Sequence, residues 1–359
     1  MEVGIVGLPG VGKSTLFQAL TGGAATTLST GGGAPAAAVG MAKVPDPRLD
    51  LISRFVPTKK ITAAALRIVD IPGFAVGGEG AAFARAVLAH IRQVDAICHV
   101  VRCFEDAAGE AIKPLRDIDT METELILADL AVAENARDKA AKTARSGDRE
   151  AKARLAALEK VVPQLEDGRP IRSIDGLSDE EHAALRGYGM ISAKPILYVA
   201  NIGEDALGSE AAAWMQELRS FAAEQGSGLV VVCAKLEAEL AELDDADRQD
   251  MLESLGLKEP ALGVVARALY KLLGLTSFYT AGEKEVRAWT IEHGATAPEA
   301  AGAIHSDIQR GFIRAECYHV DDLEQHKSEK AIREAGKLRS EGKSYRMQDG
   351  DVVHFLFNV

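Results

Sequence analysis

The chain has 359 residues, of which 47% are hydrophobic and 26% are charged, and 53 acidic against 41 basic residues give it a net charge of −12. This composition excludes a disordered or collagen-like chain and predicts two or three folded domains. The negative charge argues against indiscriminate wrapping of nucleic acid, although a local basic surface that binds RNA stays open.

The sequence also predicts where the protein works. No run of about 18 apolar residues is present, so we expect no membrane association. A strand-like run begins at Val3, which leaves no room for a targeting peptide. None of the four cysteines lies in a CxxC pair, which indicates reduced thiols. We therefore expect a cytoplasmic protein, and we expect it to be a monomer.

The strongest motif follows the first predicted strand, residues 3–6. Residues 7–14 read GLPGVGKS, which matches the GxxxxGK[ST] phosphate loop, and a helical run follows at residues 15–20. The glycines let backbone amides turn toward an anion, Lys13 reaches the β- and γ-phosphates, and the Ser14 hydroxyl ligates Mg²⁺. Lys13 is thus a predicted catalytic residue. The predicted nucleotide contacts of this loop are Pro9, Gly10, Val11, Gly12, Lys13, Ser14 and Thr15.

A second motif follows a predicted strand at residues 66–70. Asp70 ends this strand and begins a DxxG sequence that finishes at Gly73. In GTPases this acid holds Mg²⁺ and the glycine amide faces the γ-phosphate. We therefore predict Ser14 and Asp70 as the metal-binding residues, with Asp70 acting through water, and Gly73 as a catalytic residue.

Two later loops are predicted to read the base. They follow the strands predicted at residues 195–200 and 228–232, where GTPases carry NKxD and SAK. The predicted contacts are Asn201, Ile202, Glu204, Cys233, Ala234 and Lys235. Glu204 is one methylene longer than the aspartate that binds guanine, and Ile202 replaces the lysine. Both changes weaken the selection of guanine, so the sequence favours ATP as ligand and leaves GTP open.

The remaining segments predict a hairpin and a small C-terminal domain. Residues 121–165 form two heptad-patterned helices around a Ser-Gly-Asp turn at 146–148, which predicts an antiparallel coiled coil. The basic residues near its tip make either a solvated surface or an RNA-facing arm. From residue 276 onward we expect strands at 286–291, 312–320 and 352–357, and a helix from a capping box at Thr296 to about Arg310.

At this point the chain resembles the YchF or Obg-like ATPase family over nearly its whole length. The resemblance is carried by GLPGVGKSTLF, PDPRLD, HVVRCF, KEVRAWT, GATAP, DGD and FLFNV. It implies an α/β fold: a Ras-like P-loop NTPase domain with an inserted antiparallel coiled-coil hairpin and a C-terminal β-grasp (TGS) domain. The corresponding ranges are 1–120 with 193–275, then 121–192, and then 276–359. It also implies a Mg²⁺-dependent ATPase that associates with the ribosome or its RNA.

Four positions bear on the rate of hydrolysis. The family usually has asparagine at Gly10, proposed to bind K⁺, and a Mg²⁺-binding threonine at Ala34, for which Thr26, Thr27 or Thr30 could substitute. It carries a loop histidine that residues 106–116 lack, and it has a hydrophobic residue, here Phe74, in place of the glutamine that orients water. We therefore expect nucleotide binding with slow hydrolysis. The alternative is a nucleotide-gated ribosome- or RNA-binding module with negligible turnover.

Overall fold

The computed structural model describes residues 1–28, 36–73, 81–105, 109, 111–207 and 212–358. Its internal contacts divide the chain into two compact units. Unit 1 contains Met1–Met41 and Arg67–Val265, and unit 2 contains Ala42–Leu66 and Ala266–Val359. The chain therefore passes from one unit to the other three times.

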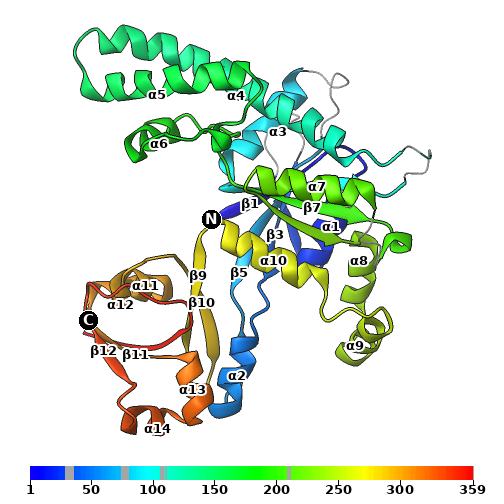
Figure 1. Cartoon of the computed structure of the whole chain (residues 1–359). Coiled ribbons are helices and arrows are strands. Elements are labelled where there is room, and N and C mark those ends of the chain that lie inside the picture. The colour runs from blue at the N-terminus through cyan, green and yellow to red at the C-terminus, as the bar shows by residue number, and fades with distance from the viewer. Residues whose placement is uncertain (29–35, 74–80, 106–108, 110, 208–211, 359) are drawn as a thin grey trace. The chain divides into compact units, whose positions relative to one another are not determined.

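Unit 1 is built on a seven-stranded sheet (Figure 1). Strands β6 and β7 are buried along almost their whole length, as expected of parallel strands covered on both faces. The pairs of β1 with β5, β1 with β6, β6 with β7 and β7 with β8 are parallel, and β2 with β3 is antiparallel. The strands lie in the order β2 (Ala25–Leu28), β3 (Ala37–Lys43), β5 (Ala65–Asp70), β1 (Glu2–Val6), β6 (Ala96–Cys103), β7 (Ile196–Ile202) and β8 (Gly228–Val232).

Parallel neighbours need crossover connections, and helices supply most of them in unit 1. The core between sheet and helices contains Ile97, Tyr198 and Leu218. Glu237 lies at the start of an acidic run yet is buried, because its carboxylate accepts hydrogen bonds from the first two amides of α10. The helices and short 3-10 turn around the sheet are α1 (Lys13–Thr21), α3 (Ala81–Gln93), η2 (Glu204–Ala206), α7 (Ala213–Glu224), α8 (Ala234–Glu242), α9 (Asp245–Ser254) and the start of α10 (Ala261–Leu272).

The predicted hairpin is formed by α4 (Pro114–Ala144) and α5 (Arg149–Glu166). Alanines of α4 pack against larger aliphatic residues of α5 in one hydrophobic cluster, which also contacts the 3-10 turn η1 (Ile171–Ser173) and α6 (Asp179–Arg186). Helix α4 begins seven residues before the sequence prediction, because Pro114 fits the first position of a helix. Of the described helices, none has both the length and the apolar character needed to cross a membrane.

Unit 2 contains a six-stranded sheet. The strand order is β12 (Arg339–Glu341), β11 (Phe312–His319), β13 (Asp351–Phe357), β9 (Leu275–Thr280), β10 (Val286–Glu292) and β4 (Ile61–Thr62). Its helices are α2 (Pro47–Phe55), α11 (Ala297–Ile304), α12 (Ser306–Arg310), α13 (Val320–His326) and α14 (Glu329–Glu334). The helix predicted from Thr296 to Arg310 is thus two helices. His305 is extended between them, and its ring accepts a hydrogen bond from the Asp307 amide.

Residues 42–66 differ from the sequence assignment, which placed them in the nucleotide-binding domain. In the structure they belong to unit 2, because β4 pairs in parallel with β10 and α2 packs within the same unit. The register sets Ile61 opposite Val286. A segment between two strands of one sheet therefore supplies an edge strand and a helix to another.

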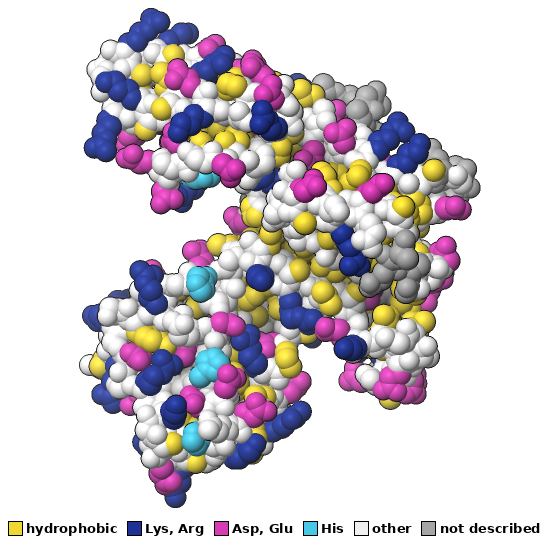
Figure 2. Space-filling model, in the orientation of Figure 1, with side chains coloured by type: hydrophobic (Ala, Val, Ile, Leu, Met, Phe, Trp, Pro, Cys, Tyr) yellow, Lys and Arg dark blue, Asp and Glu magenta, His cyan; other side chains and the backbone are white. Residues whose placement is uncertain are grey.

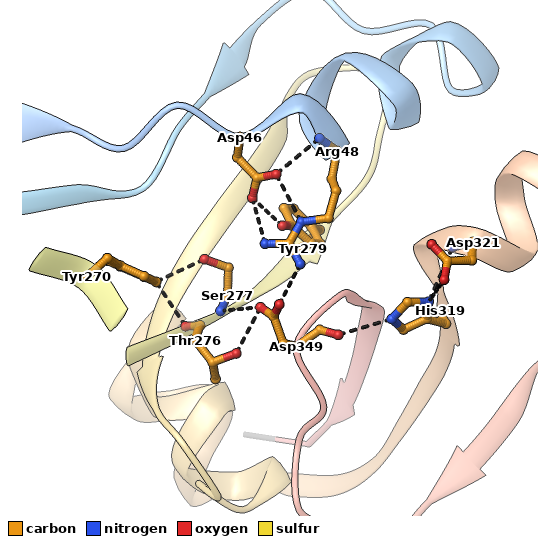
Figure 3. A network of polar contacts seen from close by, with 9 residues as sticks. All are labelled: Asp46, Arg48, Tyr270, Thr276, Ser277, Tyr279, His319, Asp321 and Asp349. Carbon is orange, nitrogen blue, oxygen red and sulfur yellow. Dashed lines mark hydrogen bonds and ion pairs between the residues drawn. The ribbon is translucent and has the colours of Figure 1, made fainter. Parts of the chain in front are cut away.

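A polar network in unit 2 holds this segment in place (Figure 3). The guanidinium of Arg48 donates to Asp46 at 2.9 Å and to Asp349 at 2.7 Å. Asp349 also accepts from the Thr276 hydroxyl and the Ser277 amide. Burial alone would raise the pKa of Asp349, but these donors outweigh it and hold the pKa below its usual range. The helix α2 and the turn before β13 are thereby joined by a carboxylate that stays charged.

Candidate functional site

The loop between β1 and α1 has the backbone that the phosphate-loop motif predicts. Gly10 and Gly12 have φ angles of 75° and 91°, in the left-handed region that favours glycine. A Cβ at Gly12 would lie 2.3 Å from the side-chain nitrogen of Asn201, whereas a Cβ at Gly10 would meet no atom within 4 Å. The loop therefore packs tightly against Asn201 of β7 at Gly12, whereas at Gly10 there is space for a side chain.

Lys13, the first residue of α1, turns back over this loop. Its ammonium donates to the Leu8 carbonyl at 2.7 Å, and its side chain is buried. Burial lowers the pKa of Lys13, and the nearby carboxylate of Asp70 opposes that shift. A Cβ on Gly73 would lie 2.6 Å from the Lys13 ammonium, so a larger residue there would push against the lysine. The structure thus brings the two predicted catalytic residues together.

The two predicted metal ligands are also in contact. The Ser14 hydroxyl donates to one carboxylate oxygen of Asp70 at 2.9 Å. The other oxygen of Asp70 is buried and has no hydrogen-bond partner among the described residues, and burial raises the pKa of this carboxyl. A hydroxyl beside a carboxylate with a free oxygen is the hard-oxygen donor set that Mg²⁺ prefers. The residues present therefore fit the ion.

Asn201 links the phosphate loop to the second base-reading loop. Its side-chain NH₂ donates to the Val11 carbonyl at 2.9 Å, and its side-chain oxygen accepts from the Ala234 amide at 2.9 Å. Ala234 begins α8, where the amide has no acceptor within the helix. Asn201 is also 95% buried. The sequence assigned this amide to the base, and the structure shows it first as a brace between two loops.

A cavity of about 550 Å³ lies beside the loop (Figure 1 shows the elements around it). At its rim Lys235 and Glu204 form an exposed ion pair at 3.2 Å, which raises the pKa of Lys235. Ile202 and Cys233 are buried in its wall. The described lining residues are Gly10, Gly12, Thr15, Phe104, Glu105, Asn201, Ile202, Gly203, Glu204, Asp205, Cys233, Ala234 and Lys235.

Comparisons with known proteins agree on one family. Residues 2–133 match a family model described as "50S ribosome-binding GTPase", and residues 275–358 match the model YchF-GTPase_C, described as "Protein of unknown function (DUF933)". The chain is 47% identical to "Ribosome-binding ATPase YchF" of Pasteurella multocida, covering 100% of this chain and 99% of the relative. It is 43% identical to the Bacillus subtilis protein of that name, with 100% of both covered. The chain belongs to the YchF family.

A solved structure agrees with this assignment. The Schizosaccharomyces pombe YchF GTPase superposes with a TM-score of 0.86 at 32% identity, covering 99% of this chain and 97% of the other. The family and the mixed α/β fold with a P-loop GTPase domain, expected from the sequence, are therefore confirmed.

Other positions singled out by the sequence fall outside the described residues. These are Thr30, Ala34 and Phe74, the side chain of Thr27, and part of the 106–116 segment. Pro9 and Thr15 are exposed at the loop, and Val11 is buried behind it.

Sequence reasoning missed Phe104 and Glu105 as lining residues of the cavity. They directly follow β6, and the signal was available, since ligands in open α/β sheets bind beyond the carboxyl ends of the strands. Leu8 was also missed. It acts through its backbone carbonyl, which a side-chain pattern does not reveal.

The brace made by Asn201 predicts an unusually costly substitution. Asn201→Asp places an oxygen where NH₂ now donates to Val11, and Asn201→Ala leaves the Val11 carbonyl and the Ala234 amide without partners. We expect each to lower the free energy of unfolding by about 1–3 kcal/mol and to weaken nucleotide binding. Urea denaturation followed by Trp214 fluorescence measures the loss. The exposed Asn135→Asp makes the same chemical change on α4 and should cost less than about 0.5 kcal/mol; equal costs at both positions would contradict the brace.

His99 on β6 predicts a pH-dependent stability. Burial, with smaller contributions from the charges of Arg172 and Lys13, lowers its pKa to about 3. The unfolded chain binds this proton near pH 6.5 and the folded chain does not, so stability is lost as pH falls from 6.5 toward 3. Between pH 6.5 and 4.5 the wild type should lose about 1.4 kcal/mol per pH unit more than His99→Gln. Urea midpoints measure this, with the exposed His293→Gln as control; parallel slopes in wild type and His99→Gln would refute it.

Proposed function

We propose that this protein is a Mg²⁺-dependent P-loop ATPase that associates with the ribosome and acts as a slow switch in translation. The observation that carries the proposal is the contact of Ser14 with Asp70 beside the buried ammonium of Lys13. The second oxygen of Asp70 has no partner within the described part of the chain. These groups supply one cation and one hard-oxygen donor set at the mouth of a glycine-rich loop. That combination suits the β- and γ-phosphates of a nucleoside triphosphate.

The chain's own residues position and neutralise the phosphates in this proposal. Lys13 exchanges its bond to the Leu8 carbonyl for the phosphate oxygens, and loop amides donate to the same oxygens. Ser14 and Asp70 would hold Mg²⁺, which would neutralise charge on the β- and γ-phosphates. The Gly73 amide would face the γ-phosphate, and a side chain at this position would press against the Lys13 ammonium. Gly10 offers no side chain to a K⁺ ion, so we propose hydrolysis without K⁺ stimulation.

We infer ATP as the preferred nucleotide, with GTP as the weaker ligand. Ile202 is buried, and the Glu204 carboxylate is paired with Lys235 rather than free to accept from guanine. Removing the acceptor that guanine needs also removes a repulsion against N1 of adenine. The proposed contacts to the nucleotide are those assigned from the sequence, and Asn201 acts mainly through the loops that it joins.

Two observations support a ribosomal partner. The Pasteurella multocida and Bacillus subtilis relatives are both named ribosome-binding ATPases. Figure 2 shows dark-blue basic side chains gathered at the free end of the hairpin. Near the turn between α4 and α5, four exposed cations have no ion-pair partner within the described part of the chain, namely Lys139, Lys142, Arg145 and Lys152. Unpaired cations on a projecting element suit RNA phosphates. We propose residues 121–192 as the hairpin domain, 276–359 as a TGS domain, and the cytoplasm as the location.

Base selection gives the first test. The double variant Ile202→Lys/Glu204→Asp restores the guanine-reading pattern, so we expect GTP affinity to rise at least tenfold, or about 1.4 kcal/mol, while ATP affinity falls. Titration of labelled ATP and GTP measures both. The exposed Glu217→Asp on α7, outside the lining of the cavity, should change neither affinity by more than twofold. Unchanged GTP affinity in the double variant would remove the base-reading argument.

Turnover separates the switch from its alternative, a nucleotide-gated ribosome-binding module with negligible hydrolysis. We expect the wild type to release phosphate over many turnovers, faster with ribosomes, and slower in a single turnover than a family member that keeps the threonine and loop histidine. Lys13→Ala should weaken ATP binding at least a hundredfold, and Lys139→Ala should not. ATP binding without multiple turnovers, with or without ribosomes, would favour the alternative.

A further inference from the structure

A second cavity, which we call the basic cavity, lies on another side of the phosphate loop. Its volume is about 450 Å³, and the described residues that line it are Leu8, Arg102, Ala111, Lys113, Arg116, Asp117 and Thr120. It shares none of these residues with the cavity of about 550 Å³ that Asn201, Glu204 and Lys235 line. The two cavities lie on either side of the end of β6. Arg102 lines the basic cavity, whereas Phe104 and Glu105 line the other one.

The charge of the basic cavity is unbalanced. Among its described lining residues, three carry cationic side chains and one, Asp117, carries a carboxylate. The ammonium of Lys113 and the guanidinium of Arg116 make no hydrogen bond or ion pair with any described residue. Both side chains are exposed, while Arg102 is half-buried on β6. Two unpaired cations beside a fixed third one attract an anion, and a guanidinium suits the geometry of phosphate oxygens.

The position of the basic cavity identifies the anion. Leu8 forms part of its wall, and the Leu8 carbonyl is the acceptor for the Lys13 ammonium. Arg102 lies in register opposite Asn201, which braces the phosphate loop. The cavity therefore adjoins the loop where the proposed hydrolysis of ATP produces ADP and inorganic phosphate. It also lies outside the carboxyl ends of parallel strands, where open α/β sheets bind their ligands.

We propose that the basic cavity is a second anion site, which binds inorganic phosphate through Lys113, Arg116 and Arg102. The proposal rests on the proposed function for the origin of the ion, and on the unpaired cations for its binding. The cavity adjoins the phosphate loop at Leu8 but shares no described lining residue with the cavity beside Asn201, so a phosphate ion and a nucleotide bind at the same time. The acid Asp117 limits the affinity and favours release of the ion.

Calorimetric titration of inorganic phosphate into the full-length protein saturated with ADP and Mg²⁺ tests the proposal. ADP fills the α- and β-phosphate positions of the loop but leaves the γ-phosphate position open, so dependence of the phosphate binding on Lys113 and Arg116 is what assigns it to the basic cavity. We expect the wild type to bind phosphate, and Lys113→Gln/Arg116→Gln to bind it at least tenfold more weakly while its ADP affinity stays within twofold. The control variant Lys139→Gln/Lys142→Gln also removes two positive charges, from positions farther along α4. It should leave phosphate affinity within twofold of the wild type.

Three outcomes would overturn the basic cavity as an anion site. They are no phosphate binding by the ADP-saturated wild type, equal affinity in the wild type and the Lys113/Arg116 variant, and equal losses in the two double variants. Failure of ADP to bind would contradict the proposed function alone, because phosphate binding that depends on Lys113 and Arg116 supports the cavity with or without ADP.

Discussion

The side-chain amide of Asn201 is the interaction on which the site in unit 1 depends. It joins the Val11 carbonyl in the phosphate loop to the Ala234 amide at the start of α8, so two loops from opposite ends of the unit's sequence take fixed positions. Burial in a low-dielectric interior strengthens both bonds and makes the loss of either one costly. Gly12 is the counterpart of this brace, since any side chain there would displace the amide.

Burial also shapes the part of the site formed by Lys13 and Asp70. Lys13 is buried and its ammonium donates to the Leu8 carbonyl, while one oxygen of Asp70 lacks a partner among the residues that the structure describes. Burial of both groups disfavours their charged forms, which lowers the pKa of the lysine and raises that of the acid. A triphosphate with Mg²⁺ would reverse both shifts by supplying the missing opposite charges. Groups destabilised in this way are typical of a site prepared for a charged ligand.

The sheet of unit 2 includes a segment from the first fifth of the chain, which must be held in place far from its neighbours in sequence. Residues 42–66 leave one sheet after β3, contribute α2 and β4 to the other, and return as β5. The Arg48 guanidinium fixes this excursion by bridging Asp46 and Asp349, residues about 300 positions apart in sequence (Figure 3). Such a bridge stabilises unit 2 only when both segments are folded, which makes its folding cooperative.

The sequence by itself predicted the glycine-rich loop, the acid that ends β5, the loops after β7 and β8, the turn between α4 and α5 and most strands. Each of these is a local pattern whose residue types follow from backbone conformation or from one ligand contact. Only the tertiary structure decided that Asn201 braces two loops, that Gly73 lies against Lys13, and that residues 42–66 belong to unit 2. Those features are contacts between segments far apart in the chain, and no local propensity encodes the partner that a buried amide, glycine or arginine will meet.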